Sequence, residues 1–226
     1  METIDKIIKS STEFYNDLKA DEHDRYRSWE HCYSHFMTAR KENNVNIDYL
    51  SLQLAFYLAS WGMYRGSSFL LQKDYRVHIP VVREILSNKY DSLAGIECKD
   101  FKNETNQKLL KGINEFIANY YDVIRREVRG SAQKNNLSNT LITKILMGTL
   151  GCVPAYDRYF VTGIRSEKIA SGTYNIKSIL QLVDFYEKNI EQLDSVQKSF
   201  IVTDMLYPQM KILDMGFWQI GFALDN

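Results

Sequence analysis

The chain has 226 residues, of which 45% are hydrophobic, and its 28 basic and 28 acidic side chains cancel to a formal net charge of zero. This composition excludes an intrinsically disordered chain, which has few aromatic residues and an unbalanced charge. It also excludes a protein that binds nucleic acid or acidic membranes through bulk positive charge. A chain of this length can bury a large core in one or two domains.

The cellular location is predicted from the N-terminus, the apolar runs and the cysteines. The first residues, METIDKIIKSSTEFYNDLK, contain no apolar core of a secretory signal. The apolar run 52–64 stops at Arg65 and is shorter than the roughly 20 residues that span a bilayer, so no membrane partner is expected. Cys32, Cys98 and Cys152 are widely spaced, which favours free thiols in the cytoplasm over disulfides or a zinc site.

Apolar residues recur every three or four positions along most of the chain, a pattern typical of amphipathic helices. The clearest examples are the stretches 109–128 and 176–193. The same pattern predicts helices over residues 2–19, 23–41, 47–63, 79–88, 139–150, 157–163, 196–206 and 208–222.

The segments between the predicted helices show no clear sign of a sheet. Tyr75, Val77 and Ile79 alternate as a strand would, but three residues cannot form a sheet. The polar stretches 89–106 and 129–139 are expected to be loops, and the second marks a soft division between two helical layers. We therefore predict an all-α fold of about ten helices in a single domain, 1–226.

Glycine residues cluster with aromatic residues in three segments, 59–71, 144–160 and 207–222. Glycine within a helix costs about 1 kcal/mol relative to alanine. Its repeated use therefore indicates that the backbone comes close either to another helix or to a ligand. Tight helix crossings and a ligand-lined cleft are the two interpretations.

In the first of these segments, Arg65 is followed by Gly66 and Ser67. A guanidinium group and the N–H groups of a following turn can share a phosphate or a carboxylate. The alternative is an internal ion pair between Arg65 and Asp157 or Asp214. The lysine and the spacing of a nucleotide-binding phosphate loop are missing.

In the second segment, the order GTLGCVPAYD places Asp157 at the start of a helix. A carboxylate there caps free N–H groups beside the positive end of the helix dipole. The order of helix, glycine, short apolar turn, proline, aspartate and helix over residues 140–160 resembles the stretch after the hairpin in helix-hairpin-helix DNA glycosylases. The resemblance implies that Asp157, with Pro154 before it and Arg158 after it, is catalytic and faces a damaged base.

The chain also departs from that family. The stretch NNLSNTLITK (135–144) stands where the family has a glycine-rich hairpin that clamps phosphate, and no four-cysteine cluster follows. No lysine occupies the position used by bifunctional glycosylases, because Lys144 belongs to a helical pattern. A shared helical architecture is what the resemblance predicts, with capping as the alternative role of Asp157.

A local basic patch follows the long helix, made of Arg125, Arg126, Arg129 and Lys134. Such a patch can contact nucleic-acid phosphates even in a neutral chain. Cations are also favoured at the C-terminal end of a helix by its dipole, which is the alternative explanation.

Histidines offer a competing site. His31 and His35 are four residues apart and share a helix face, with His23, Asp24 or Glu30 as further ligand candidates. There is no HExxH motif, and His23 points about 80° away on a helix of 3.6 residues per turn. We therefore expect no metal site. No cofactor motif is present, so no cofactor is expected.

The third segment, 207–222, has few polar residues on any side, so it is expected to be buried centrally or to form a subunit interface. Three hypotheses follow. One is a nucleic-acid-associated protein, distantly glycosylase-like, that uses the basic patch and Asp157. Another is a structural or regulatory homo-oligomer. The third is a protein that binds a small anionic ligand in a pocket formed by Trp61, Arg65, Ser67, Tyr156, Arg158, Asp214 and Trp218.

Overall fold

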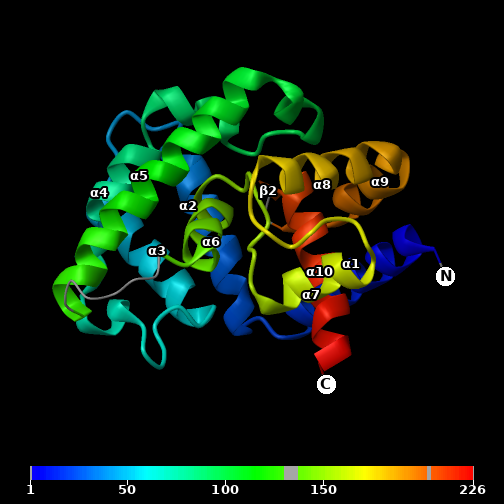
Figure 1. Ribbon diagram of the computed structural model, residues 1–226, viewed down its shortest axis with the longest axis horizontal. Coiled ribbons are helices and arrows are strands. Elements are labelled where there is room, and N and C mark those ends of the chain that lie inside the picture. The colour runs from blue at the N-terminus through cyan, green and yellow to red at the C-terminus, as the bar shows by residue number, and fades with distance from the viewer. Residues whose placement is uncertain (1, 130–136, 203–204, 226) are drawn as a thin grey trace.

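The computed structural model describes residues 2–129, 137–202 and 205–225 (Figure 1). Within these ranges the chain is almost entirely helical, which confirms the predicted all-α fold. The α-helices are α1 Thr3–Ala20, α2 Ser28–Ala39, α3 Ile47–Ser60, α4 Ile79–Ile85, α5 Glu104–Arg129, α6 Asn139–Thr149, α7 Arg158–Ser166, α8 Ile176–Lys188, α9 Ile190–Ser199 and α10 Gln209–Asp225. The 3₁₀ helices are η1 Arg25–Arg27, η2 Phe69–Gln72, η3 Tyr75–His78, η4 Asn88–Leu93 and η5 Cys98–Lys102.

Three predicted helices differ clearly from the structure. The helix predicted over 23–41 begins as α2 only at Ser28, after the 3₁₀ helix η1. The stretch 176–193 is divided at Asn189, whose side-chain amide donates a hydrogen bond to the carbonyl of Phe185 and ends α8. The helix predicted over 196–206 is wrong in its second half, because α9 ends at Ser199 and a hairpin follows. In this hairpin β1 Ile201–Val202 pairs antiparallel with β2 Met205–Leu206.

Two segments outside the predicted helices also carry regular structure. The alternating stretch at Tyr75 is the 3₁₀ helix η3, which begins where the side chain of Asp74 accepts a hydrogen bond from the N–H of Arg76. The stretch expected as a loop over 89–106 contains η4 and η5, which bury Leu93 and Phe101. Short 3₁₀ turns of this kind carry no periodicity that a sequence pattern reveals.

Helix α6 lies at the centre of the fold. In Figure 1, α3, α4 and α5 lie on one side of it, and α7, α8, α9 and α10 lie on the other. It packs against α2 and α3, and every residue from Leu141 to Thr149 is buried. At Gly148 an added Cβ would come within 2.4 Å of the ring of Tyr57. The predicted close approach at this glycine is therefore confirmed as a contact inside the protein.

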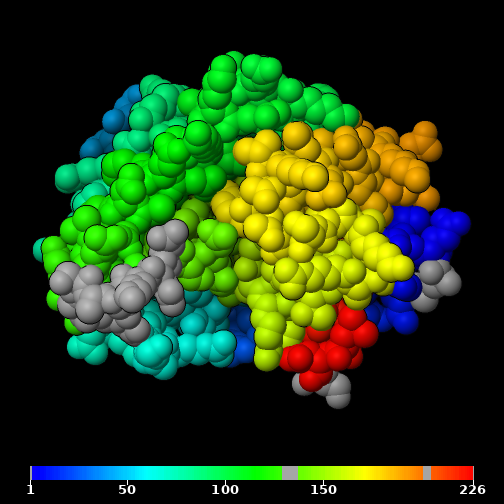
Figure 2. All heavy atoms as spheres, in the orientation of Figure 1, coloured from blue at the N-terminus to red at the C-terminus, as the bar shows by residue number. Residues whose placement is uncertain are grey.

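The C-terminal helix docks centrally, as predicted. Helix α10 packs against α1 and α7, and all its residues from Gln209 to Trp218 are buried. Its last turn, from Phe222 onward, is exposed beside α7 (Figure 2). Packing within the chain therefore covers most of the helix expected as an oligomer interface. Among the described residues, none of the helices combines the length and apolar character that a bilayer span requires.

A buried histidine leads to a prediction about stability at low pH. His78 is fully buried, with Nε2 2.6 Å from the hydroxyl of Tyr64 and Nδ1 2.5 Å from that of Tyr121. Burial lowers the pKa of His78 from 6.5 to about 3. Between these values the unfolded chain binds a proton that the folded chain does not, so this group makes the protein less stable as the pH falls below 6.5.

From this group alone we expect a loss of about 2 kcal/mol in the free energy of unfolding between pH 7 and pH 5. Urea titrations at both pH values measure the loss for the wild-type chain and for His78→Gln. The variant is expected to show a smaller difference between the two pH values. The same difference in both proteins would contradict the assignment.

Candidate functional site

A pocket of about 500 Å³ opens where segments far apart in the sequence meet. The turn containing η1, the end of α3, α6, the start of α7 and the exposed end of α10 all contribute to its lining. The volume is within the range of small-molecule binding sites. Five of the residues predicted to form a site converge here, namely Trp61, Arg65, Asp157, Arg158 and Trp218.

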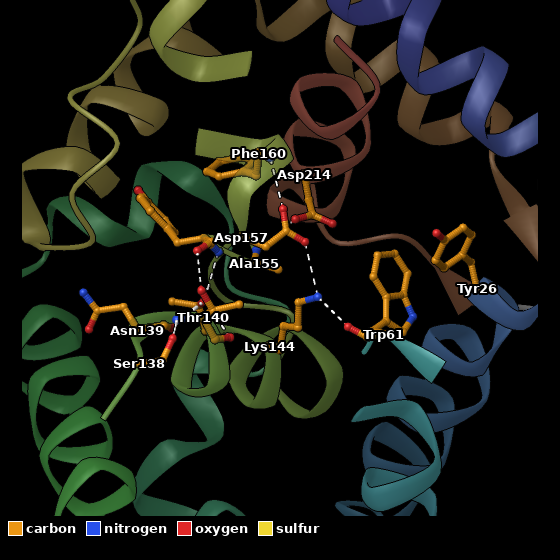
Figure 3. A network of polar contacts seen from close by, with 12 residues as sticks. Tyr26, Trp61, Ser138, Asn139, Thr140, Lys144, Ala155, Asp157, Phe160 and Asp214 are labelled. Atoms are coloured by element: carbon orange, nitrogen blue, oxygen red, sulfur yellow. Dashed lines mark hydrogen bonds and ion pairs between the residues drawn. The ribbon is translucent and has the colours of Figure 1, made fainter. Parts of the chain in front are cut away.

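A buried lysine and an aspartate meet at this pocket (Figure 3). The ammonium group of Lys144, on α6, lies 3.2 Å from Oδ2 of Asp157. It also donates a hydrogen bond of 2.9 Å to the carbonyl of Trp61. Only 5% of the Lys144 side chain is exposed, against 14% of the Asp157 side chain. The pair therefore has limited contact with water and faces whatever enters the pocket.

Asp157 is fixed by the start of α7. It is the N-cap residue of that helix, and its Oδ1 accepts a hydrogen bond of 3.1 Å from the N–H of Phe160. The predicted capping role is confirmed. Because the cap uses only Oδ1, Oδ2 is left to Lys144. The same carboxylate therefore has a structural oxygen and an oxygen that faces the amine.

The loop that leads to Asp157 is held by buried hydrogen bonds, several of which Figure 3 shows. Oδ1 of Asp214 accepts the N–H of Ala155 at 2.9 Å. Oγ1 of Thr143 accepts the N–H of Tyr156 at 2.9 Å, and Oγ1 of Thr140 donates to the carbonyl of Tyr156 at 3.0 Å. These contacts tie the loop to α6 and α10, so that Lys144 and Asp157 are placed by the same framework.

The surroundings of Lys144 make its ammonium group lose a proton more readily than an exposed lysine does. Burial lowers its pKa below the ordinary value of 10.5, Asp157 acts in the opposite direction, and the positive charge of Arg65 lowers the pKa further. A lysine that loses its proton more readily is a better nucleophile near neutral pH. The adjacent carboxylate can accept the proton that the amine releases.

Aromatic rings form the pocket walls. The ring of Trp61 lies 4.6 Å from that of Tyr26 and 6.5 Å from that of Trp218, measured between centroids. Trp218 is in turn stacked on Phe222 at 5.1 Å and meets the edge of Tyr159 at 5.2 Å. Walls of this kind fit a planar ring, which stacks on aromatic faces whatever its substituents.

Arginine side chains line the pocket together with these walls. Arg25, Arg65 and Arg158 are exposed, and Arg158 is ion-paired with Asp225 at 2.7 Å. Within the described part of the chain no carboxylate pairs with Arg25 or Arg65. The predicted alternative of an internal ion pair for Arg65 is therefore wrong, because the amines of Lys144 and Lys211 occupy the two aspartates considered for it.

Three residues expected in a ligand pocket do not line it. Ser67 is exposed outside the lining. Tyr156 is buried, and its hydroxyl is hydrogen-bonded to Ser178 at 2.7 Å. Asp214 is buried and ion-paired with Lys211 at 2.8 Å. Tyr156 and Asp214 are excluded for the same physical reason, because buried polar groups need partners inside the protein and are then unavailable to a ligand. Ser67 is instead excluded by its position, since it lies on the surface outside the lining.

The predicted basic patch is smaller than its sequence indicates. Arg125 is buried and pairs with Asp122, which also pairs with the exposed Arg126 at 2.7 Å. Helix α5 ends at Arg129, whose side chain lies outside the described residues, as does Lys134. The patch therefore stays a prediction, with Arg126 as its described exposed member.

The histidines have ordinary surroundings. Nε2 of His35 lies 3.0 Å from the hydroxyl of Tyr49, and His31 is exposed. In the described ranges, no group of three or more histidine, cysteine, aspartate or glutamate residues is arranged to hold a metal ion. The geometry gives His31 and His35 no role in the pocket.

Sequence reasoning missed Arg25 and Tyr26, and it set Lys144 aside because that residue belongs to a helical pattern. One signal for Lys144 was present, because it is the only charged residue in the run LITKILMG. A lysine in a fully buried helix requires an internal partner, and such a partner is a candidate site residue. Nothing in the sequence indicated that the turn at Tyr26 reaches this pocket.

Comparisons with known proteins identify no relative. The chain matched no protein-family model, no curated protein and no solved structure. The function must therefore be inferred from the residues of the pocket.

Proposed function

We propose that this chain is an enzyme that acts on damaged DNA, of the glycosylase and lyase type, with Lys144 as the nucleophile and Asp157 as its acid–base partner. The observation that carries the proposal is the buried Lys144–Asp157 pair in a pocket with aromatic walls and arginine side chains. The resemblance of residues 140–160 to helix-hairpin-helix glycosylases supports action on damaged DNA. It places no lysine at Lys144, so the role of that residue rests on the geometry of the pocket.

The residues that line the pocket suit a nucleotide that has been extruded from the DNA helix. A base taken out of the helical stack gains stacking contacts with aromatic side chains such as Trp61 and Trp218. Its flanking phosphates require cations, which Arg25 and Arg65 supply without the loss of an ion pair. A local site of this kind is compatible with a net charge of zero.

The chemistry begins when the ammonium group of Lys144 gives a proton to Asp157 and becomes a neutral amine. The neutral amine attacks C1′ of the nucleotide, and the bond between C1′ and the base breaks. The base leaves with the electron pair and takes up the proton that Asp157 received. The nitrogen bound to C1′, which is positively charged after the attack, then gives a proton to Asp157. Its freed lone pair forms a C=N bond as the bond between C1′ and the ring oxygen breaks, and the ring oxygen takes up that proton. The resulting iminium ion loses a proton from C2′ and expels the 3′ phosphate.

Borohydride trapping tests this proposal. Hydride reduces the iminium ion to a stable amine, so the wild-type chain is expected to form a covalent adduct with an oligonucleotide that contains an abasic site. Lys144→Gln is expected to lose at least about 99% of the adduct, because an imine requires an amine and Lys144 is the one lysine among the described residues that line the pocket. Lys177→Gln, which changes an exposed lysine of α8, is the matched control and is expected to retain it.

Peptide mass mapping of the adduct locates the modified residue. A modification at Lys144 supports the proposal. Two results would contradict it: no adduct with either single-stranded or duplex abasic DNA, or equal adduct from the Lys144→Gln variant.

A second candidate function is the binding of a small anionic ligand. It is favoured by Arg25 and Arg65, which line the pocket without an ion pair in the described part of the chain. The two candidates differ in outcome. A deoxynucleoside monophosphate that raises the melting temperature, with no adduct to abasic DNA, would favour the small ligand.

The expected cytoplasmic location stays a prediction. Cys32, Cys98 and Cys152 are free and buried. Burial raises the pKa of Cys152 to about 12, so its thiol stays protonated and unreactive. Free thiols fit a reducing compartment, and fractionation of cells that express the chain tests the location.

A further inference from the structure

The aromatic wall formed by Trp61 is flanked by two ammonium groups. Nζ of Lys144 lies 5.4 Å from the centroid of the Trp61 ring, and Nζ of Lys211 lies 4.9 Å from it. Lys211 also lies 4.8 Å from the ring of Trp29 and 5.5 Å from that of Phe14. The face of an aromatic ring attracts cations because its electrostatic potential is negative. A ring that already has an ammonium group nearby therefore attracts a second cation less strongly.

Lys211 is fixed in this position. Its side chain on α10 is 2% exposed, and its ammonium group pairs at 2.8 Å with Oδ2 of Asp214, itself 2% exposed. The other oxygen of Asp214 accepts the N–H of Ala155. The ammonium group therefore stays beneath the pocket wall when a ligand enters.

The charged groups that line the pocket also disfavour a cation. The one carboxylate among the described residues that line it, Asp157, is ion-paired with Lys144. The nearby carboxylate of Asp225 is paired with Arg158. Arg65 adds a positive charge that no described carboxylate neutralises. A positively charged base entering this pocket would meet cations and no unpaired carboxylate, whereas a base with carbonyl oxygens would meet hydrogen-bond donors.

We infer that the pocket selects uncharged bases with carbonyl oxygens and rejects positively charged, alkylated bases, and that the Lys211–Asp214 pair beneath Trp61 contributes to this selectivity. The inference rests on the proposed function, since it names the class of base that the proposed enzyme accepts. In this inference Lys211 places a positive charge beside the ring of Trp61 and does not itself contact the substrate.

Two single-stranded oligonucleotides of the same sequence test the inference. One carries 1-methylguanine, which is neutral at neutral pH, and the other carries 1-methyladenine, which is a cation; both have the methyl group at the same ring position. A 2′-fluoro substituent on each modified nucleotide keeps the glycosidic bond intact during the measurement. Because both oligonucleotides are single-stranded, the two modified bases cannot differ in how they pair with an opposite base.

The dissociation constants are measured by fluorescence anisotropy with the wild-type chain. We expect the neutral base to be bound at least about five-fold more tightly than the cation, a factor within the range of cation–aromatic energies. Equal affinities, or tighter binding of 1-methyladenine, would overturn the inference.

The double variant Lys211→Met with Asp214→Asn tests the part assigned to the buried pair. It removes both charges together, so neither is left unpaired in the core, and the asparagine oxygen can still accept the N–H of Ala155. Circular dichroism confirms that the variant is folded. The ratio of the two dissociation constants is expected to move toward one, and an unchanged ratio would overturn the role of Lys211.

The two proposals can fail separately. Adduct formation with an abasic site involves no base, so it is unaffected by base selectivity. An adduct together with no preference for the neutral base would refute the selectivity alone, whereas the absence of any adduct would refute the proposed enzyme.

Discussion

Asp157→Asn is expected to slow base release about a hundred-fold, while adduct formation with a ready-made abasic site falls much less. Base release builds positive charge at C1′, and removal of one group that stabilises such charge costs about 10²-fold to 10³-fold in rate. An abasic site already has a free aldehyde, so imine formation depends mainly on the amine of Lys144. Single-turnover rates on the two substrates measure the difference.

Asp157→Asn removes the negative charge of the side chain but keeps its role as the N-cap of α7. Asparagine caps helices about as well as aspartate, so the hydrogen bond from the N–H of Phe160 is expected to persist. Asp157→Ala removes both the charge and the cap, and is expected to cost about a further 1 kcal/mol of stability. An equal loss of both rates in Asp157→Asn would contradict the separate roles assigned to the two residues.

The same variant is expected to shift a pH profile. Asp157 raises the pKa of Lys144, whereas burial lowers it. Without the carboxylate the pKa falls further, so the neutral amine is present at lower pH. The rising limb of adduct formation against pH should therefore move to lower pH in Asp157→Asn. A shift to higher pH, or none, would contradict the coupling between the two groups.

The helices were predictable because burial imposes a regular spacing of apolar residues. The predicted ends of helices were wrong where local hydrogen bonds compete with that spacing. Asn189 ends α8 inside an apolar pattern that continues beyond it, because its side chain bonds to the backbone. The hairpin β1–β2 occupies a stretch that also fits helical spacing. Short segments of this kind satisfy both patterns, and tertiary contacts decide between them.

The site was predictable in part, for a physical reason. Glycine–aromatic segments mark places where the backbone approaches other groups, and they led to Trp61, Arg65 and Trp218. Lys144 was set aside because its pairing with Asp157 depends on the path of the chain between α6 and α7, which includes Gly151 with a φ of +63°. Tyr26 comes from a distant turn, and no spacing in one sequence reports a contact between such distant segments.

Gly221→Ala is expected to destabilise the fold by about 3 kcal/mol, the upper part of the usual range for overpacking in a core. Helices α7 and α10 cross with their backbones in contact. A Cβ at Gly221 would lie 1.9 Å from the carbonyl oxygen of Tyr159, and one at Gly163 would lie 2.0 Å from that of Phe217. Backbone atoms cannot rotate away as a side chain can, so the helices must separate.

Gly112→Ala is the matched control. Gly112 also lies within a helix, α5, but it is exposed and an added Cβ would meet nothing within 4 Å. There the change is expected to stabilise the protein by about 1 kcal/mol through helix propensity. Urea unfolding measures both variants. If Gly221→Ala were as stable as the wild-type chain, the crossing would not be as tight as described.

Separation of these helices is also expected to reach the pocket. Helix α7 begins at Asp157, and α10 carries Trp218, whose ring meets Tyr159 at 5.2 Å. An alanine at position 221 that pushes α10 away from α7 would widen the wall formed by Trp218. At a temperature where Gly221→Ala remains folded, we expect several-fold weaker binding of single-stranded DNA, measured by anisotropy. Unchanged binding together with lowered stability would show that the crossing supports the fold without positioning the pocket.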